Sequence, residues 1–328
     1  MRRREYIKLL GGLALASLLG LADSAVAEYP ERPVTIIVPF AAGGPSDVMA
    51  RILADRMRLT LKQPVIVENI TGAGGSIGVT RAVRSAPDGY TISFGHLGTH
   101  VFNGAIYPLT FDLLIDLEPV AMLPSNPMVI VSKNDLPAKT LKELIAWAKQ
   151  NSGNVSAGTA GAGSGSHIGG VYFENITGVK LQFVPYRGTG PALNDLMAGQ
   201  IDIMIDQTSN SINQIRFGKI RAYAVTDQKR VPTADDIPTV DEAGLPRFYM
   251  TLWSGMWVPK GTPKAAITKL NAAVVEALAD LSVRARFAQL GLEVPPRARQ
   301  TPEALATHHK AEIAKWWPII KAGNIRAD

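Results

Sequence analysis

The stretch PVTIIVPFAAGGPSDVMARIL, residues 33–53, predicts a buried strand that leads almost directly into a helix. Four of the five residues at 34–38 are apolar, and Met49 and Leu53 then lie four residues apart, as one buried helix face requires. The joint between the two elements, residues 39–47, holds mostly small side chains. N–H groups at the start of a helix lack helical partners and carry partial positive charge. We therefore expect this joint to bind an anionic group.

Two further glycine-rich joints follow later strand candidates. NITGAGGSIG occupies residues 69–78, and AGTAGAGSGSHI occupies residues 157–168. Glycine lets a ligand approach the backbone with no Cβ in the way, and ligands of open α/β sheets lie at the carboxyl ends of strands. Ordinary turn chemistry would explain one such joint, but it explains three in one chain less well. We expect each joint to present free N–H groups to an anion.

Short apolar segments alternate with amphipathic ones along the chain. Thr140 and Glu143 form a capping box, in which each is expected to satisfy the backbone N–H of the other. Thr262 and Pro263 are expected at the N-cap and first position of another helix. Strands that alternate with helices predict the α/β class, with parallel sheets and helices on both faces. The strand candidates are residues 34–38, 65–68, 90–94, 128–131, 154–157, 181–184, 203–205, 220–225 and 253–258.

The division into lobes follows from the order of these elements, because no fixed-period repeat or low-complexity linker marks a boundary. Hinge candidates are residues 124–127 and 248–254, where one series of strands and helices ends and another begins. The C-terminal helices must pack on elements that are already formed. We expect a discontinuous first lobe of residues 28–126 and 253–328, which encloses a second lobe of residues 127–252.

The first 27 residues carry the three parts of a signal peptide. Two arginines begin a twin-arginine pattern, an apolar run follows, and Ala25-Val26-Ala27 provides the small residues of a cleavage site. A membrane anchor is the alternative, but the run is interrupted by glycines and is short for a bilayer. We expect export to the periplasm, by the twin-arginine or the general route, with the mature chain starting at Glu28.

Charge and cysteine content exclude several classes of protein. The chain carries 34 basic and 28 acidic side chains, and removal of residues 1–27 leaves 30 against 26. This mild excess, without a long basic run, argues against a nucleic-acid partner. Cysteine is absent, which excludes disulfides, thiolate zinc sites and a cysteine nucleophile.

None of the three joints carries a complete nucleotide-binding or catalytic motif. A P-loop needs a lysine that the joints lack, and Gly72, Gly74 and Gly78 do not have the spacing of a dinucleotide fingerprint. Residues 74–78 match the Gly-x-Ser-x-Gly elbow of serine hydrolases, but Ser76 lies several residues beyond its strand. The histidines show no zinc-binding spacing. We expect no catalysis, no metal and no cofactor, with an exported serine hydrolase as the remote alternative.

Several long blocks carry a family resemblance, and they are YPERPVTIIVPFAAGGPSDVMARILADRM, VIVENITGAGGSIGVTRAVRSAPDGYTISFG, AGTAGAGSGSHIGGVYFENITGV and VPYRGTGPALNDLMAGQIDIMIDQ. The mature chain resembles, over nearly its whole length, the substrate-binding proteins of tripartite tricarboxylate transporters, the Bug or TctC-like family. The resemblance implies the fold of a type II periplasmic binding protein, with two α/β lobes of parallel-dominated mixed sheets joined by crossing hinge segments. It also implies a receptor that closes on a small organic acid and passes it to integral-membrane transporter subunits.

The same resemblance implies the ligand site. A ligand carboxylate would lie between the loop after the first strand and a glycine-rich loop of the second lobe. Thr99 matches a further cleft position, and Asp206 matches an acidic position at the end of a second-lobe strand. The implied ligand-binding residues are Phe40, Ala41, Ala42, Gly43, Gly44, Ser46, Asp47, Thr99, Thr159, Ala160, Gly161, Gly163, Ser164, Ser166, His167 and Asp206.

The identity of the acid stays open at this point. Asp47 is expected to cap its helix, whereas Asp206 at the ligand would favour a hydroxylated or amphoteric acid. Phe40 and Tyr186 would instead favour an aromatic or long acyl acid. We expect a monomer that binds a mono- or dicarboxylate, and a ligand-sensing subunit for a signalling protein is the alternative role.

Overall fold

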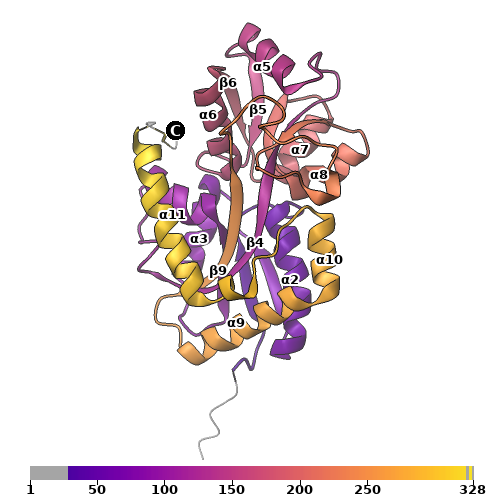
Figure 1. Ribbon diagram of the computed structural model, residues 1–328. Coiled ribbons are helices and arrows are strands. Elements are labelled where there is room, and N and C mark those ends of the chain that lie inside the picture. The colour runs from indigo at the N-terminus through magenta and orange to yellow at the C-terminus, as the bar shows by residue number, and fades with distance from the viewer. Residues whose placement is uncertain (1–28, 323–324, 327–328) are drawn as a thin grey trace, which may run out of the picture.

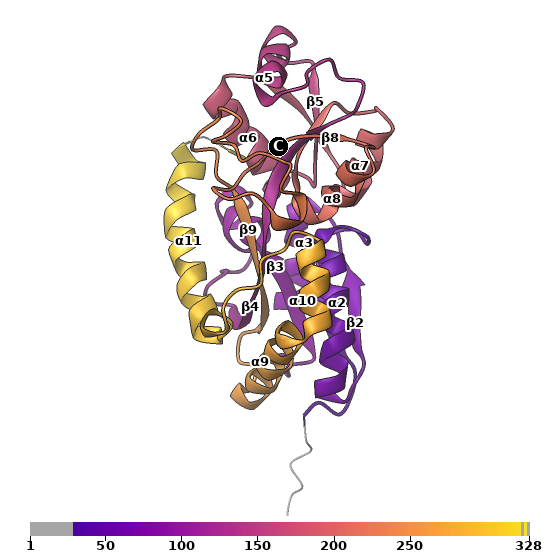
Figure 2. The ribbon, with the colours of Figure 1, turned by 45° about the vertical axis from the view of Figure 1, so that its right-hand side comes forward.

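Two lobes, stacked one above the other, make up the molecule (Figure 1, Figure 2). The computed structural model describes residues 29–322 and 325–326, so the predicted signal peptide lies outside the described residues. Two long strands, β4 (Leu117–Ser132) and β9 (Thr251–Pro259), run side by side between the lobes. The lower lobe in Figure 1 is the first lobe, and the upper one is the second.

The first lobe is built on three parallel strands formed by the apolar runs of the sequence. In β1, four of the five residues are buried, and the strand pairs on both sides. The strands are β1 (Val34–Val38), β2 (Val65–Asn69) and β3 (Thr91–His96). β3 then pairs antiparallel with β9, which joins these strands to the crossing pair.

Helices cover both faces of this sheet. Met49 and Leu53 share one apolar core with Leu270 and Phe287, so the predicted face of the first helix packs on the sheet together with two C-terminal helices. The helices on this face are α2 (Pro45–Leu61), α9 (Lys264–Ala279) and α10 (Leu281–Gln289). Those on the other face are α3 (Ser76–Val83), the short α4 (Asn103–Ile106) and α11 (Pro302–Ala322).

The second lobe repeats the alternation of strands and helices. Its parallel strands β5, β6 and β7 join β4 through an antiparallel pair between β4 and β7, and β8 also pairs with β4. The strands are β5 (Val155–Thr159), β6 (Leu181–Pro185), β7 (Ile203–Gln207) and β8 (Arg221–Val225). The helices are α5 (Leu141–Gln150), α6 (Gly165–Thr177), α7 (Thr189–Met197) and α8 (Thr208–Arg216).

The crossing strands connect both halves into one mixed sheet of order β2-β1-β3-β9-β4-β7-β5-β6. All nine strand candidates of the sequence are strands in the structure. β4, however, begins at Leu117, eleven residues before the candidate segment. The sequence obscures this extension because Pro124 and Pro127 have no backbone N–H to donate to a neighbouring strand. In the structure, the pairing of β4 with β9 shifts register between Leu123 and Asn126.

Two helix starts differ in detail from the expected caps. Thr140 Oγ1 accepts the Glu143 N–H at 3.2 Å as predicted, but the Glu143 carboxylate accepts the N–H of Lys139, at 2.7 Å, one residue earlier than expected. Thr262 does not cap its helix, because its hydroxyl donates to the Pro259 carbonyl and Pro263 is the N-cap residue.

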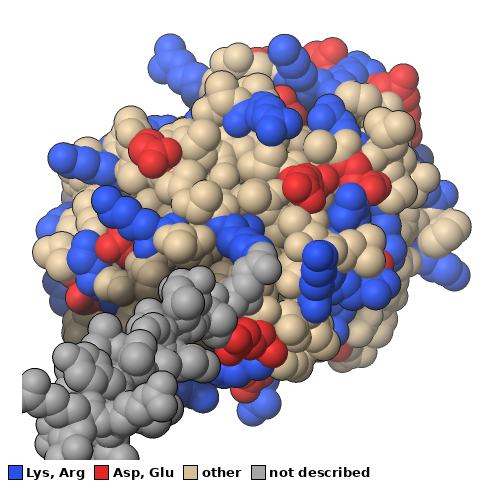
Figure 3. Space-filling model, turned by 90° about the horizontal axis from the view of Figure 1, so that it is seen from below, with Lys and Arg blue, Asp and Glu red and all other residues tan. Residues whose placement is uncertain are grey.

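The surface carries charges of both signs. On the face seen in Figure 3, Lys and Arg side chains are interspersed with Asp and Glu rather than gathered into one basic patch. Within residues 29–322, no helix combines the length and the apolar character needed to span a bilayer.

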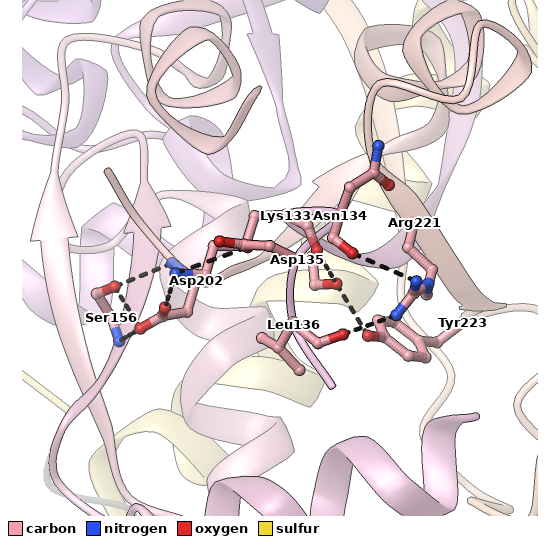
Figure 4. A network of polar contacts seen from close by, with 9 residues as sticks. Lys133, Asn134, Asp135, Leu136, Ser156, Asp202, Arg221 and Tyr223 are labelled. Atoms are coloured by element: carbon pink, nitrogen blue, oxygen red, sulfur yellow. Dashed lines mark hydrogen bonds and ion pairs between the residues drawn. The ribbon is translucent and has the colours of Figure 1, made fainter. Parts of the chain in front are cut away.

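A partly buried acidic side chain, Asp202, connects the end of β4 to β5 (Figure 4). Asp202 Oδ2 accepts hydrogen bonds from the N–H of Ser156 at 2.9 Å and from its hydroxyl at 2.7 Å, and Lys133 Nζ lies 3.0 Å from Asp202 Oδ1. Burial opposes ionisation of Asp202, but the bonds from Ser156 and Lys133 outweigh it and lower its pKa. The ionised carboxylate therefore stabilises the second lobe.

We predict that Asp202→Asn lowers the free energy of unfolding by about 1.5–3 kcal/mol at pH 7, because charge-assisted hydrogen bonds are lost. The stabilisation by Asp202 is complete above the pKa of the unfolded chain, about 3.9, and disappears as the pH falls through the lowered pKa of the folded state. Urea denaturation at several pH values measures this. The control is Asp135→Asn, because Asp135 lies 3.9 Å from Lys133 and is 75% exposed. Equal stabilities for wild type and Asp202→Asn at pH 7 would contradict the prediction.

Candidate functional site

A small cavity, called here the interlobe cavity, lies between the two lobes where two of the glycine-rich joints meet. Its volume is about 20 Å³. A cavity of roughly this volume holds one water molecule. The lining residues are Phe40, Gly44, Pro45, Ser46, His96, Met128, Ala160, Ser164, Gly165, Ser166, Thr189, Gln207 and Leu252.

Three helices begin at the interlobe cavity. α2 begins with Pro45, a position where the missing N–H has no consequence, while α6 begins with Gly165 and α7 with Thr189. The N–H groups in the first turn of each helix have no helical partners, and the peptide dipoles add up to a partial positive charge there. Because α2 belongs to the first lobe and α6 and α7 to the second, positive potential reaches the cavity from both lobes.

Side chains add neutral donors to these helix ends. Ser46, Ser166 and Thr189 line the cavity and are each at most 5% exposed. Met128 and Leu252, from the crossing strands, add an apolar wall. Among the described residues that line the cavity, none is a lysine or arginine. An anion bound here is therefore stabilised by main-chain dipoles and hydroxyl groups.

Asp47 braces the first joint rather than lining the cavity. Its Oδ2 accepts the N–H of Gly43 at 2.9 Å, and Arg51 Nη2 lies 2.9 Å from its Oδ1. Burial opposes ionisation of Asp47, but the bonds from Arg51 and Gly43 outweigh it and lower its pKa. The expected helix cap is not formed, since Gly44 is the N-cap residue and has no side-chain cap bond. Asp47 instead closes the turn that precedes the helix.

The third joint engages its loop amides internally. Ala160 N–H donates to Ser166 Oγ at 2.9 Å, and Gly163 N–H donates to His167 Nδ1 at 3.2 Å. Ser164 caps α6, because its Oγ accepts the N–H of His167 at 3.3 Å. The donors that this joint offers to a ligand are therefore those of the first turn of α6.

The second joint, residues 69–78, forms a contact between the lobes and does not line the cavity. Gly74 has a φ of +57°, and a Cβ at this position would clash with the carbonyl oxygen of Ala162. Tyr107 donates its hydroxyl hydrogen to that same oxygen at 2.6 Å, and Asn103 Nδ2 donates to the Gly74 carbonyl at 3.0 Å. The expectation that this joint faces an anion is therefore replaced by a role in bringing the lobes together.

Asp206 lies next to the cavity and is completely buried. Its Oδ2 accepts hydrogen bonds from Asn210 Nδ2 at 2.7 Å and Ser211 Oγ at 2.5 Å, while its Oδ1 has no partner among the described residues. Burial raises the pKa of Asp206 to about 6. Asn210 also donates to the carbonyl of Thr189 at 3.1 Å, so Asp206 is linked to the cavity through the first residue of α7.

Comparison with known proteins assigns the chain to a family. Residues 49–325 match the model of the tripartite tricarboxylate transporter family receptor. The chain belongs to this receptor family. The receptor is 42% identical to a UPF0065 protein of Agrobacterium vitis over 309 residues, which cover 94% of this chain and 89% of the relative.

Solved structures give the same assignment. The receptor is 43% identical to the periplasmic binding protein BugD, with a TM-score of 0.88 and coverage of 91% of this chain and all of that one. It is 40% identical to MatC of Rhodopseudomonas palustris with bound malate, with a TM-score of 0.86 and coverage of 89% and 100%. The receptor thus has the two-lobed α/β fold of the type II periplasmic binding proteins, as its sequence resemblance implied. The family consists of solute-binding receptors, not enzymes.

Ser76 of the receptor is bonded within the fold. Its Oγ accepts a hydrogen bond from Asn103 Nδ2 at 3.0 Å, and its side chain is buried. A 3₁₀ turn, Ala73–Gly75, separates it from the preceding strand, so the sharp strand-to-helix turn of a hydrolase elbow is absent from this segment. Among the described residues, no group of three or more His, Asp and Glu side chains is placed to hold a metal ion.

The structure brings part of the predicted ligand set to the cavity. Thr99 supports it from outside, because its Oγ1 accepts the N–H of His96 at 3.1 Å. The predicted ligand-binding residues that line the cavity are Phe40, Gly44, Ser46, Ala160, Ser164 and Ser166. Those outside the lining are Ala41, Ala42, Gly43, Asp47, Thr99, Thr159, Gly161, Gly163, His167 and Asp206.

Several lining residues were absent from the predicted ligand set. They are Pro45, His96, Met128, Gly165, Thr189, Gln207 and Leu252. Gly165 and Thr189 begin helices, so the rule applied to the first joint would have found them. Met128 and Leu252 carry no comparable signal, since they reach the cavity only through the course of the crossing strands.

A larger cavity, of about 440 Å³, lies on the opposite face of the crossing strands. Thr251 and Trp253 line it, whereas Leu252 between them lines the interlobe cavity, as the alternation of side chains along a strand requires. The N-termini of α2, α6 and α7 converge on the smaller cavity and not on this one.

We predict that Gly74→Ala holds the lobes of the free receptor apart, because the added Cβ meets the Ala162 carbonyl of the other lobe. Small-angle X-ray scattering should give a larger radius of gyration than for wild type. The substitution should also reduce stability by about 1–2 kcal/mol through left-handed backbone strain.

The matched control is Gly153→Ala. Gly153 also has a positive φ, of +82°, but an added Cβ there meets no atom within 4 Å. Its loss of stability should resemble that of Gly74→Ala, with no change in the radius of gyration. Equal radii for all three proteins would show that the contact between Gly74 and Ala162 does not limit closure.

Proposed function

We propose that this receptor is exported, with its signal peptide removed, and that it captures a small organic carboxylate in the periplasm. The receptor delivers this acid to the membrane subunits of a tripartite tricarboxylate-type transporter. The observation that supports the proposal is that three helix N-termini, from both lobes, converge on one cavity. None of the described residues that line this cavity is a lysine or arginine. The malate bound to MatC supports a carboxylate as the ligand.

The helix ends supply what a buried carboxylate needs. Removing a carboxylate from water costs many kcal/mol unless other donors replace the lost water. Each charge-assisted hydrogen bond contributes about 1.5–3 kcal/mol, and the first turns of α2, α6 and α7 offer several such donors with fixed directions. Ser46, Ser166 and Thr189 add hydroxyl groups at the same ends. The site thus compensates for the charge without an opposing cation.

Lobe movement follows from the size of the cavity. Its volume of about 20 Å³ is too small for an organic acid, so the lobes must separate before a ligand enters. We place the moving bodies at residues 28–126 with 253–328, and at residues 127–252, with β4 and β9 as the connection. A bound acid stabilises the closed arrangement because donors from both lobes contact it only there. The closed arrangement is what a membrane partner recognises.

A thermal-shift screen against mono-, di- and aromatic carboxylates tests the proposal. An acid present at 100 times its dissociation constant should stabilise the receptor by about 2.7 kcal/mol and raise its melting temperature. The matching alcohols and amides have the same carbon chains without the negative charge, and they should give no shift. If none of the carboxylates shifts the melting temperature, the proposed function is wrong.

We predict that Ser46→Asp strongly weakens acid binding. A negative charge in the first turn of α2 stabilises the helix but occupies the positive end that the ligand needs. Isothermal titration calorimetry with an acid found in the screen should show at least about a 100-fold weaker affinity, since roughly 3 kcal/mol is lost from one charged hydrogen bond. The control is Ser85→Asp, because Ser85 is only partly buried and lies outside the cavity lining. Unchanged affinity in Ser46→Asp would place the anion elsewhere.

A further inference from the structure

The larger cavity behind the crossing strands, called here the rear cavity, is lined by both lobes. Its volume is about 440 Å³. The second lobe contributes residues 226–228 and 249–251 to its lining, and the first lobe contributes residues from β4, from the segment 293–299 and from α11. Its walls therefore belong to the two bodies that move in the proposed function.

The rear cavity and the interlobe cavity lie on opposite faces of one strand. Leu252 of β9 lines the interlobe cavity, while Thr251 and Trp253 on either side of it line the rear cavity. When two bodies rotate about a connecting strand, the space on one face widens as the space on the other face narrows. Opening of the cleft therefore moves the second-lobe wall of the rear cavity toward the first-lobe wall.

The structure shows the cleft in a closed arrangement. The interlobe cavity has a volume of only about 20 Å³, and hydrogen bonds join the lobes beside it. Ala41 N–H donates to the carbonyl of Arg187 at 3.1 Å, and the hydroxyl of Tyr107 donates to the carbonyl of Ala162 at 2.6 Å. The rear cavity is therefore seen here near its largest size.

The first-lobe wall of the rear cavity is firmly held. Trp253 Nε1 and Trp316 Nε1 both donate to Glu312 Oε2, at 3.1 and 3.2 Å, so α11 is bonded to β9. Farther along α11, Trp317 Nε1 donates to the carbonyl of Val101 at 2.8 Å. Because these bonds fix α11 to its own lobe, the wall cannot move aside when the second lobe approaches.

Two side chains of the second-lobe wall are also held in place. Thr251 Oγ1 donates to Asp227 Oδ2 at 3.0 Å, and the hydroxyl of Tyr249 donates to Asp241 Oδ2 at 2.7 Å. Thr251 and Tyr249 line the rear cavity and do not line the interlobe cavity. Their size can therefore be changed without changing a group that lines the ligand site.

We propose that the size of the rear cavity sets the balance between the open and closed forms of the receptor, so that bulk added there holds the cleft closed. The inference rests on the lobe movement of the proposed function. Packed protein tolerates extra volume poorly, so an added group would be accommodated in the closed form and overpacked in the open one. A larger closed fraction also raises the apparent affinity for the acid.

Two substitutions that change the filling of the rear cavity in opposite directions test this inference. Thr251→Trp adds an indole to the cavity, and Tyr249→Ala removes a ring from it. Small-angle X-ray scattering of the acid-free proteins should give a smaller radius of gyration for Thr251→Trp than for Tyr249→Ala. The order holds whether wild type is mostly open or mostly closed, because the first variant shifts an open receptor and the second shifts a closed one.

Conservative variants at the same positions are the matched controls. Thr251→Val and Tyr249→Phe remove the hydrogen bonds to Asp227 and Asp241 with little change in side-chain volume, and they should keep the wild-type radius. Circular dichroism checks the folding of each protein. Thr251→Phe, which adds a smaller ring, replaces Thr251→Trp if the indole prevents folding.

Calorimetry with malate provides a second measurement. Thr251→Trp should bind malate at least about 5-fold more tightly than Tyr249→Ala, the lower end of the usual range for coupled sites. Equal radii for these two variants, or radii in the reverse order, would overturn the inference and leave the proposed function standing. The radii are measured without acid, so they decide the inference even if no carboxylate binds and the proposed function is wrong.

Discussion

The unpaired N–H groups at the starts of α2, α6 and α7 are the constraint on which the rest of the structure depends. They are useful to a ligand only if they converge, and convergence requires strands that end at the same level in both lobes and turn into helices within a few residues. The crossing strands β4 and β9 provide this alignment, because they extend through both lobes in a single sheet. The joints between strands and helices are therefore short and bare of bulky side chains.

Close approach of the two lobes sets a second requirement. At Gly74 and Ala162, and again at Gly44 and Gly190, main chain of one lobe lies against main chain of the other. A side chain at Gly74 would clash with the Ala162 carbonyl, whereas a Cβ at Gly44 or Gly190 would meet the other lobe at an ordinary contact distance. Gly74 is thus the glycine that lets the two lobes come together.

Much of the fold could be predicted from the sequence, because apolar runs and helix-start signals are local. The strand at 34–38 and the helix face of Met49 and Leu53 follow directly from their spacing. β4 was predicted too short, since Pro124 and Pro127 resemble a break unless the partner strand is known.

The site was less predictable for a related reason. All three joints have similar composition, yet the second one meets Ala162 instead of the cavity, which depends on how the lobes are placed. The contacts of His96 could not be predicted from its neighbours in sequence either. The position of its ring depends on the hydrogen bond from Gly98 and on stacking with Phe40, 56 residues away in the chain.

The proposed recognition of the acid by main-chain groups has an evolutionary consequence. A backbone N–H is present whatever side chain its residue carries, proline excepted, so point mutations seldom remove it. The variable part of the cavity is the set of side chains around it, such as Met128, Leu252 and Gln207. A duplicated gene can therefore explore new substrates by exchanging these residues while it inherits an intact hold on the acid group, which suits such a scaffold to a large and diverse set of paralogues.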